Sequence, residues 1–147
     1  MKKVTIYTDG ASRGNPGPAS LGVVLKNEKA QVFKEYSQFL GSKLTNNEAE
    51  YLAVIFALKK FKLLFGKKLA KISEVELKSD SDLLVKQLNG KYKIIDKKIQ
   101  ELFLEVWNLK LDFKKVKFVH IPRSRNKRAD ALANQSLDER AKTQKLL

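Results

Sequence analysis

The first forty residues contain three segments typical of β-strands, and their close spacing limits the fold more than any other feature of the chain. β-Branched and aromatic residues are concentrated in residues 3–9, 21–26 and 32–40. A loop dense in Gly, Pro, Asn and Ser begins at Gly10, and a short polar turn separates the second segment from the third. Because sequential strands with short links usually pair with each other, we expect an antiparallel meander.

Helical and strand patterns alternate through the rest of the chain. We expect helices over residues 45–65, 81–89, 94–110 and 126–142, and strands over residues 74–79 and 115–121. Thr45 and Glu48 have capping-box spacing at the start of the long helix, and Gly66 is expected to end it.

This order of elements predicts an α/β fold, in which a five-stranded mixed β-sheet, part antiparallel meander and part parallel strands, is flanked by α-helices. The long helix would form the crossover between the third and fourth strands. No linker or repeat interrupts the pattern, so we expect a single domain over residues 1–142 and a short, loose polar tail over residues 143–147.

Basic residues dominate the composition. Thirty Lys and Arg stand against 16 Asp and Glu among 147 residues, which gives a net charge of +14. Such a charge attracts polyanions, and nucleic acid is the common partner, although a ribosome-associated protein or a lysine-rich proteome would also explain it. The absence of cysteine excludes disulfides and thiolate metal sites. Because the apolar runs are too short to span a membrane and no signal peptide is visible, we expect a cytoplasmic protein.

Two aspartates follow predicted strands. Asp9 ends the first strand and Asp80 follows the fourth. If these strands are parallel neighbours, both carboxylates lie at the carboxyl edge of the sheet, where open α/β sheets tend to bind ligands. Either residue taken alone is better explained as the cap of the turn or helix that follows it.

Two further acids lie on apolar helical faces. Apolar residues follow Glu50 at offsets of 3, 4, 7, 11 and 14 positions, which places its carboxylate at the head of the core-facing stripe. Asp130 has a similar position in the last helix, before Ala133 and Leu137. A buried carboxylate needs a metal ion or a basic partner, whereas an acid near a helix N-terminus is also explained by the helix dipole.

A divalent cation would explain why four acids converge in a basic chain. Mg²⁺ prefers oxygen ligands and combines carboxylates with water and substrate phosphate. Two such ions can activate a water molecule and stabilise the leaving oxygen in a displacement at phosphorus.

Four motifs in this order resemble the type 1 ribonuclease H family, in what looks like its compact bacterial or archaeal-type branch. They are TDGASRGNPGP, TNNEAEYLA, SDSDLLVKQLNG and NKRADALAN, and together they span nearly the whole chain. The resemblance implies an RNase H-like fold and four metal-binding catalytic carboxylates, Asp9, Glu50, Asp80 and Asp130. It also implies two Mg²⁺ ions, with Mn²⁺ as the alternative, and an RNA–DNA hybrid as substrate.

The resemblance also implies substrate contacts. Asn15, Asn46 and Asn47 would lie along the hybrid, with the Gly10 backbone close by, because an amide both donates to and accepts from a ribose 2′-hydroxyl. Asn46 and Asn47 are alternatively explained as a helix start. Further candidates for substrate contacts are Ser12, Thr45, Ser81 and Asn126.

Three departures from the family pattern concern the substrate side of the site. The stretch HIPRSRNKRAD lacks glycine, so His120 is either a catalytic proton shuttle or part of the strand, in which case Arg123, Arg125 or solvent would assist product release. Residues 90–98 are too short for an inserted basic helix, and Asp82 adds a negative charge near the substrate. A smaller basic surface, or simply a solvated lysine face, is formed by Lys86, Lys91, Lys93, Lys97 and Lys98.

The sequence therefore predicts a monomeric endonuclease that hydrolyses the RNA strand of RNA–DNA hybrids by two-metal catalysis and leaves 5′-phosphate and 3′-hydroxyl ends. The alternatives are a catalytically weak or inactive binding module with the same fold, another nuclease such as a junction resolvase, and a basic RNA-binding protein without an active site.

Overall fold

The structure, a computed structural model, describes residues 3–146 and confirms the predicted five-stranded mixed sheet. The strands follow the order β3-β2-β1-β4-β5, with antiparallel pairing among β1, β2 and β3 and parallel pairing of β4 with β1 and β5. The strands are β1 (Lys3–Ser12), β2 (Gly17–Lys26), β3 (Val32–Leu44), β4 (Glu74–Ser79) and β5 (Lys115–His120). The meander and the crossover are therefore present as expected.

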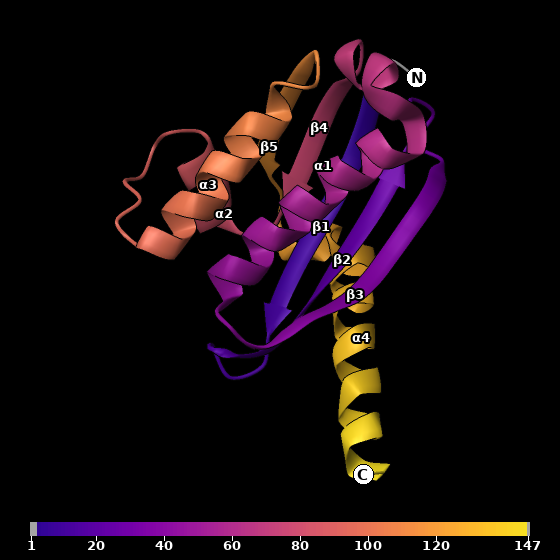
Figure 1. Cartoon of the computed structure of the whole chain (residues 1–147). Helices are drawn as coiled ribbons and strands as arrows, with labels where there is room; N and C mark the ends of the chain where they lie inside the picture. Colours follow the sequence, from indigo (N-terminus) through magenta and orange to yellow (C-terminus); the bar gives the residue numbers. More distant parts are fainter. Residues whose placement is uncertain (1–2, 147) are drawn as a thin grey trace.

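Helices cover both faces of this sheet (Figure 1). α1 packs on β1 and β2 and against α3 on one face, whereas α4 packs on β2, β1 and β3 on the other. The helices are α1 (Asn46–Lys71), α2 (Asp82–Leu88), α3 (Lys97–Lys110), the 3-10 helix η1 (Arg123–Arg125) and α4 (Lys127–Leu146). The main core fills the space between the sheet and α1, and a smaller cluster of Val24, Ala129 and Leu132 lies under α4.

Local contacts explain where the elements differ from expectation. β1 continues through Gly10 to Ser12, instead of ending at Asp9, because these residues pair with β2. The helix predicted to end before Gly66 resumes after a kink there, since glycine tolerates the positive φ of 84°. Two residues earlier, Leu64, which is the last position of the predicted apolar face, is exposed.

The third and last helices also differ at one end. α3 begins at Lys97, instead of residue 94, because the Asp96 side chain caps it by accepting a hydrogen bond from Ile99 N. α4 continues to Leu146, so the loose tail expected from residue 143 is helical as far as the structure describes it. None of the helices within residues 3–146 combines the length and hydrophobicity needed to cross a bilayer. The cytoplasmic location and the monomeric state stay predictions.

Two glycines let helices approach the sheet from opposite faces beside Asp9. A Cβ atom on Gly10 would lie 2.3 Å from the carbonyl carbon of Ala49 in α1, and one on Gly22 would lie 2.0 Å from the carbonyl oxygen of Ala129 in α4. Gly22 is the register partner of Asp9 in β2, and Gly10 is the next residue in β1. Because neighbouring strand residues point to opposite faces, α1 and α4 both reach the sheet at this point.

Candidate active site

Asp9 and Glu50 form the buried part of the site. Asp9 is 6% exposed in β1, and Glu50 is 7% exposed in the first turns of α1. The start of α1 is fixed by the predicted capping box, in which Thr45 Oγ1 accepts from Glu48 N and Glu48 Oε1 accepts from Thr45 N. The Gly10 N–H donates a hydrogen bond to Glu50 Oε1, which ties the carboxylate to the strand that carries Asp9.

Asp80 completes a group of three carboxylates. It follows β4, which is parallel to β1, so the expectation that both aspartates lie at one edge of the sheet is confirmed. One oxygen from each of Asp9, Glu50 and Asp80 lies within 4.8 Å of the others. Such spacing lets one cation contact all three groups.

Mutual repulsion and burial disfavour the ionised forms of these groups. Burial raises the pKa of Asp9 to about 8, with further contributions from the charges of Asp80 and Asp130. Burial, followed by the charge of Asp9, raises the pKa of Glu50 well above its ordinary value, although the Gly10 hydrogen bond opposes the change. Burial also raises the pKa of Asp80, against a hydrogen bond from Asn126.

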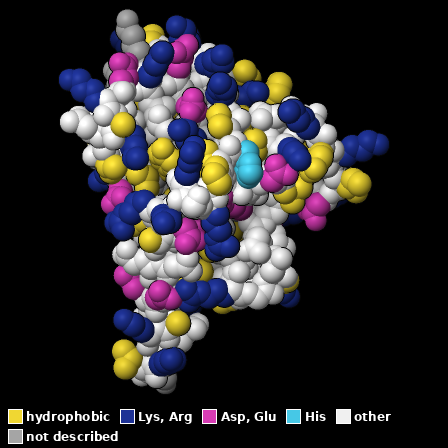
Figure 2. All heavy atoms as spheres, turned by 180° about the vertical axis from the view of Figure 1, so that it is seen from behind, with side chains coloured by type: hydrophobic (Ala, Val, Ile, Leu, Met, Phe, Trp, Pro, Cys, Tyr) yellow, Lys and Arg dark blue, Asp and Glu magenta, His cyan; other side chains and the backbone are white. Residues whose placement is uncertain are grey.

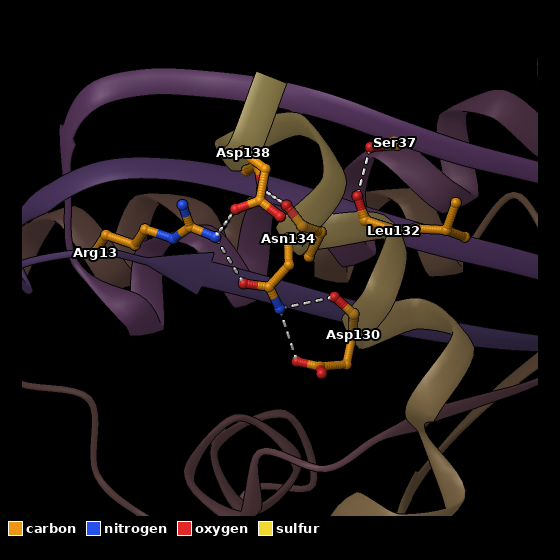
Figure 3. Close-up of polar contacts among 8 residues, drawn as sticks. Arg13, Ser37, Asp130, Leu132, Asn134 and Asp138 are labelled. Carbon is orange, nitrogen blue, oxygen red and sulfur yellow. Dashed lines mark hydrogen bonds and ion pairs between the residues drawn. The ribbon is translucent and has the colours of Figure 1, made fainter. Parts of the chain in front are cut away.

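Asp130, the fourth predicted carboxylate, lies on α4 at the same pocket but outside the group of three. Its Oδ1 accepts a hydrogen bond from Asn134 Nδ2 at 3.3 Å (Figure 3). Arg123 Nη2 lies 3.9 Å from the same oxygen, and the Arg123 side chain is 83% exposed. The side-chain contact with Asp130 contributes to the raised pKa of Asp9, which places the two carboxylates next to each other.

The residues present fit a divalent cation. Within residues 3–146, Asp9, Glu50 and Asp80 form no ion pair with Lys or Arg, and the weak Arg123–Asp130 contact is the only one made by the four acids. A buried carboxylate without a cation is unfavourable, and two such groups side by side are more so. An all-oxygen donor set of this kind suits a hard ion such as Mg²⁺ or Mn²⁺.

The carboxylates line a pocket of about 450 Å³. Gly10, Ser12, Asn46 and Ser81, four of the predicted substrate contacts, line the same pocket. Asn46 Oδ1 accepts from Ser12 N at 2.9 Å, which leaves its amide N–H groups on the exposed side chain as donors.

The remaining predicted substrate residues lie beside or beneath the pocket. Asn15 is exposed and its Oδ1 accepts from Asn46 N at 2.9 Å. Thr45 uses its hydroxyl in the helix cap. Asn47 donates to Gln87 Oε1 at 3.3 Å, and its own Oδ1 is buried, so this side chain is turned toward α2 instead of the pocket.

Asn126 does not fit the predicted substrate contact. It is 1% exposed, and its Nδ2 donates to the Thr8 carbonyl oxygen at 2.9 Å. The same side chain forms a hydrogen bond with Asp80. Its burial and its bonds to Thr8 and Asp80 instead favour a role in positioning Asp80 against β1.

His120 does not line the pocket, whereas Arg123 does. The histidine is the exposed last residue of β5, paired in register with Ser79, so the interpretation of His120 as part of the strand is confirmed. The stretch after it forms η1, which brings Arg123 toward Asp130.

The surface around the site is basic, but its lysines do not lie on an inserted basic helix. The described segment between α2 and α3 contains no inserted basic helix, as predicted, and its lysines are exposed. Asp82 pairs with Lys86 at 2.9 Å, so its charge is balanced within α2. Figure 2 shows Lys and Arg side chains spread over one face of the molecule with acidic groups between them.

Several residues that shape the site were missed from the sequence. Gly22 allows α4 to approach Asp9, and Arg13 and Asn134 line the pocket beside Asp130. The spacing of four residues between Asp130 and Asn134 could have indicated their contact, since such pairs meet on a helix. No local pattern indicates the contact of Arg13 with residues more than a hundred positions away.

Comparison with known proteins gives consistent results. A family profile described as "Reverse transcriptase-like" matches residues 7–136. Ribonuclease HI of Halobacterium salinarum is 40% identical over 137 residues, which cover 93% of this chain and 65% of that protein. Ribonuclease H of Chlorobium phaeobacteroides is 35% identical over 154 aligned positions, which cover 93% of this chain and 97% of the relative.

The fold is also similar to solved structures. The crystal structure of LC11-RNase H1 in complex with an RNA/DNA hybrid, a protein isolated from compost, superimposes with a TM-score of 0.88 at 42% identity and covers 94% of this chain and 99% of the other. The chain spans only 65% of the Halobacterium relative and 37% of three mycobacterial relatives, so the activities of those longer proteins do not transfer as a whole. The profile match and the relatives covered almost end to end place this chain in the ribonuclease H family.

Proposed function

We propose that this protein is an endoribonuclease that hydrolyses the RNA strand of RNA–DNA hybrids and leaves 5′-phosphate and 3′-hydroxyl ends. The observation that carries the proposal is the meeting of Asp9, Glu50 and Asp80 within 4.8 Å, with Asp130 on the same pocket and no ion pair from the three to Lys or Arg within residues 3–146. The solved complex of a 42% identical RNase H1 with an RNA/DNA hybrid supports the choice of substrate.

The four carboxylates would hold two Mg²⁺ ions, with Mn²⁺ as the alternative. Asp9 would contribute to both sites, Glu50 and Asp80 to one, and Asp130 to the other. The bound ions would lower the pKa of the attacking water and stabilise the departing 3′ oxygen. The chain's own part is to hold these carboxylates in place, through the Gly10 N–H on Glu50, Asn126 on Asp80 and Asn134 on Asp130.

Polar groups along the pocket would recognise the RNA strand. The exposed Asn46 amide and the Gly10–Ser12 backbone lie beside the carboxylates, where the ribose next to the scissile phosphate would be held. Recognition of 2′-hydroxyls distinguishes RNA from DNA without reading bases. The net charge of +14 would supply sequence-independent affinity that falls steeply as salt increases.

A cleavage assay on matched hybrid, double-stranded RNA and double-stranded DNA tests the proposal. We expect cleavage of the hybrid alone, in Mg²⁺ and not in EDTA. The RNA fragments should carry 3′-hydroxyl and 5′-phosphate ends. Equal cleavage of duplex DNA would favour a resolvase-type nuclease, and hybrid binding without cleavage would favour the inactive module. Binding of RNA alone, without metal dependence, would point to a basic RNA-binding protein.

A further inference from the structure

A network of polar side chains extends from Asp130 through Asn134 to Arg13 and Asp138 (Figure 3). Asn134, one turn later in α4, donates through Nδ2 to the Asp130 carbonyl oxygen at 3.0 Å and to Asp130 Oδ1 at 3.3 Å. Arg13, from the connection between β1 and β2, donates through Nη2 to Asn134 Oδ1 at 3.2 Å and to Asp138 Oδ1 at 2.6 Å. Four side chains from two distant parts of the chain therefore form one connected row.

The groups that can donate and accept determine the direction of each hydrogen bond in this row. A guanidinium has only donors, so the Asn134 atom that faces Arg13 must be the carbonyl oxygen. The amide NH₂ of Asn134 then has to face Asp130, whose carboxylate and backbone carbonyl both accept. Arg13 forms its ion pair with Asp138. It can therefore donate a hydrogen bond to Asn134 without forming an ion pair with Asp130.

We propose that Asn134 is a positioning residue that holds the Asp130 carboxylate in the orientation needed for its divalent ion, and that the Arg13–Asp138 pair holds Asn134. This inference rests on the proposed function. Asp130 needs such support more than Glu50 does, because Glu50 receives a backbone N–H from β1, whereas within residues 3–146 the only basic side chain paired with Asp130 Oδ1 is the highly exposed Arg123. A hydrogen-bond partner of this kind changes metal affinity by about 10- to 100-fold in other metal sites.

Direct contact with the substrate is the competing role for Asn134, because Arg13 and Asn134 both line the pocket. The two roles differ in what they change. Loss of a positioning residue weakens the metal that Asp130 holds, in the absence of any nucleic acid. Loss of a substrate contact instead raises the KM for the hybrid and leaves metal binding unchanged.

The test compares Asn134→Leu, which keeps the size of the side chain and removes its amide, with Gln135→Leu as the matched control. Gln135 is the next residue of α4, is exposed, and within residues 3–146 its side chain forms a hydrogen bond with Glu139 alone, at 3.4 Å. Mn²⁺ binding to the protein alone is measured by titration calorimetry, and the Mg²⁺ concentration for half-maximal cleavage is measured alongside. Asp138→Asn, at an exposed position, weakens the outer end of the row with little risk to folding.

For Asn134→Leu we expect the Kd of the weaker Mn²⁺ site to rise about tenfold, with a matching increase in the Mg²⁺ requirement and little change in KM at saturating metal. Asp138→Asn should show a smaller change in the same direction, and Gln135→Leu none. Unchanged Mn²⁺ binding in Asn134→Leu, or a higher KM with an unchanged metal requirement, would overturn the inference. If the wild-type protein itself neither binds Mn²⁺ nor cleaves the hybrid, the proposed function fails instead.

Discussion

The inner carboxylates Asp9 and Glu50 and the outer carboxylate Asp130 are held in place in different ways. The inner pair is fixed by backbone: Asp9 belongs to a paired strand, and Glu50 accepts a hydrogen bond from the Gly10 N–H where α1 meets β1. Asp130 is oriented mainly by the side chain of Asn134, which depends on Arg13 and Asp138.

This difference indicates which part of the site can be substituted without disturbing the fold. The inner pair cannot move unless α1 separates from the sheet, since a backbone contact at Gly10 leaves no space for even a methyl group. The support of Asp130 consists of partly or fully exposed polar side chains, which can be replaced one at a time. Substitutions in the inner pair should therefore abolish activity, whereas those around Asp130 should tune it.

The largest expected effect is that of Asp9→Asn on catalysis. The substitution removes the carboxylate that interacts with the other three while keeping its size, so hybrid binding should persist and cleavage should fall to about 0.1% or less, equivalent to about 4 kcal/mol of transition-state stabilisation. Single-turnover cleavage and filter binding measure the two quantities. Substantial activity in this variant would contradict the proposed site.

Gly10→Ala and Gly22→Ala test whether backbone contact fixes the inner site. The new methyl groups would lie 2.3 Å from Ala49 and 2.0 Å from Ala129, and overpacking of this kind costs about 1–3 kcal/mol or more. For a chain of this length we expect Tm to fall by roughly 3–10 °C. Gly41→Ala, where the nearest atom is Leu44 Cδ1 at 3.5 Å, is the control and should leave Tm nearly unchanged.

Stability in EDTA should depend on pH through the inner pair. The folded pKa of Asp9 is about 8 against an ordinary value of 3.8, so its stabilising contribution is complete below about pH 4 and is lost as the pH rises through 8. The Tm of the wild type should therefore fall relative to that of Asp9→Asn between pH 4 and 8, by thermal denaturation. Parallel curves for the two proteins would contradict the raised pKa.

Adding Mg²⁺ at pH 8 should reverse much of this loss. A ligand that binds only the folded state stabilises it, and the ionised carboxylates are the form that binds the ion. The increase in Tm should be larger for the wild type than for Asp9→Asn. An equal increase in both proteins would indicate ion binding elsewhere.

The smallest effect should come from His120→Ala. His120 is exposed at the end of β5 and does not line the pocket, so we expect kcat to change by less than about twofold, close to the behaviour of an ordinary surface position. Arg123→Ala should reduce activity more, because Arg123 lies 3.9 Å from Asp130. A large loss at His120 with none at Arg123 would reverse the assignment of the residue that assists product release.

The sequence by itself determined the order of strands and helices along the chain, the cap at Thr45 and the set of four acids. These features depend on residues at most a few positions apart, such as the alternation of a strand, the stripe of a helix or the capping-box spacing. The convergence of Asp9 and Asp80 also followed, because parallel strands bring their carboxyl ends to one edge.

Only the tertiary structure decided how the acids are supported. Asn126 and Thr8 are 118 positions apart and Arg13 and Asn134 are 121 apart, so no periodic pattern records that they meet. The burial of Asn126, the turn of Asn47 toward Gln87 and the place of His120 outside the pocket depend on how α2, η1 and α4 pack on the sheet. A side chain's direction is set by its local backbone, but its partner is set by whichever distant element packs against it.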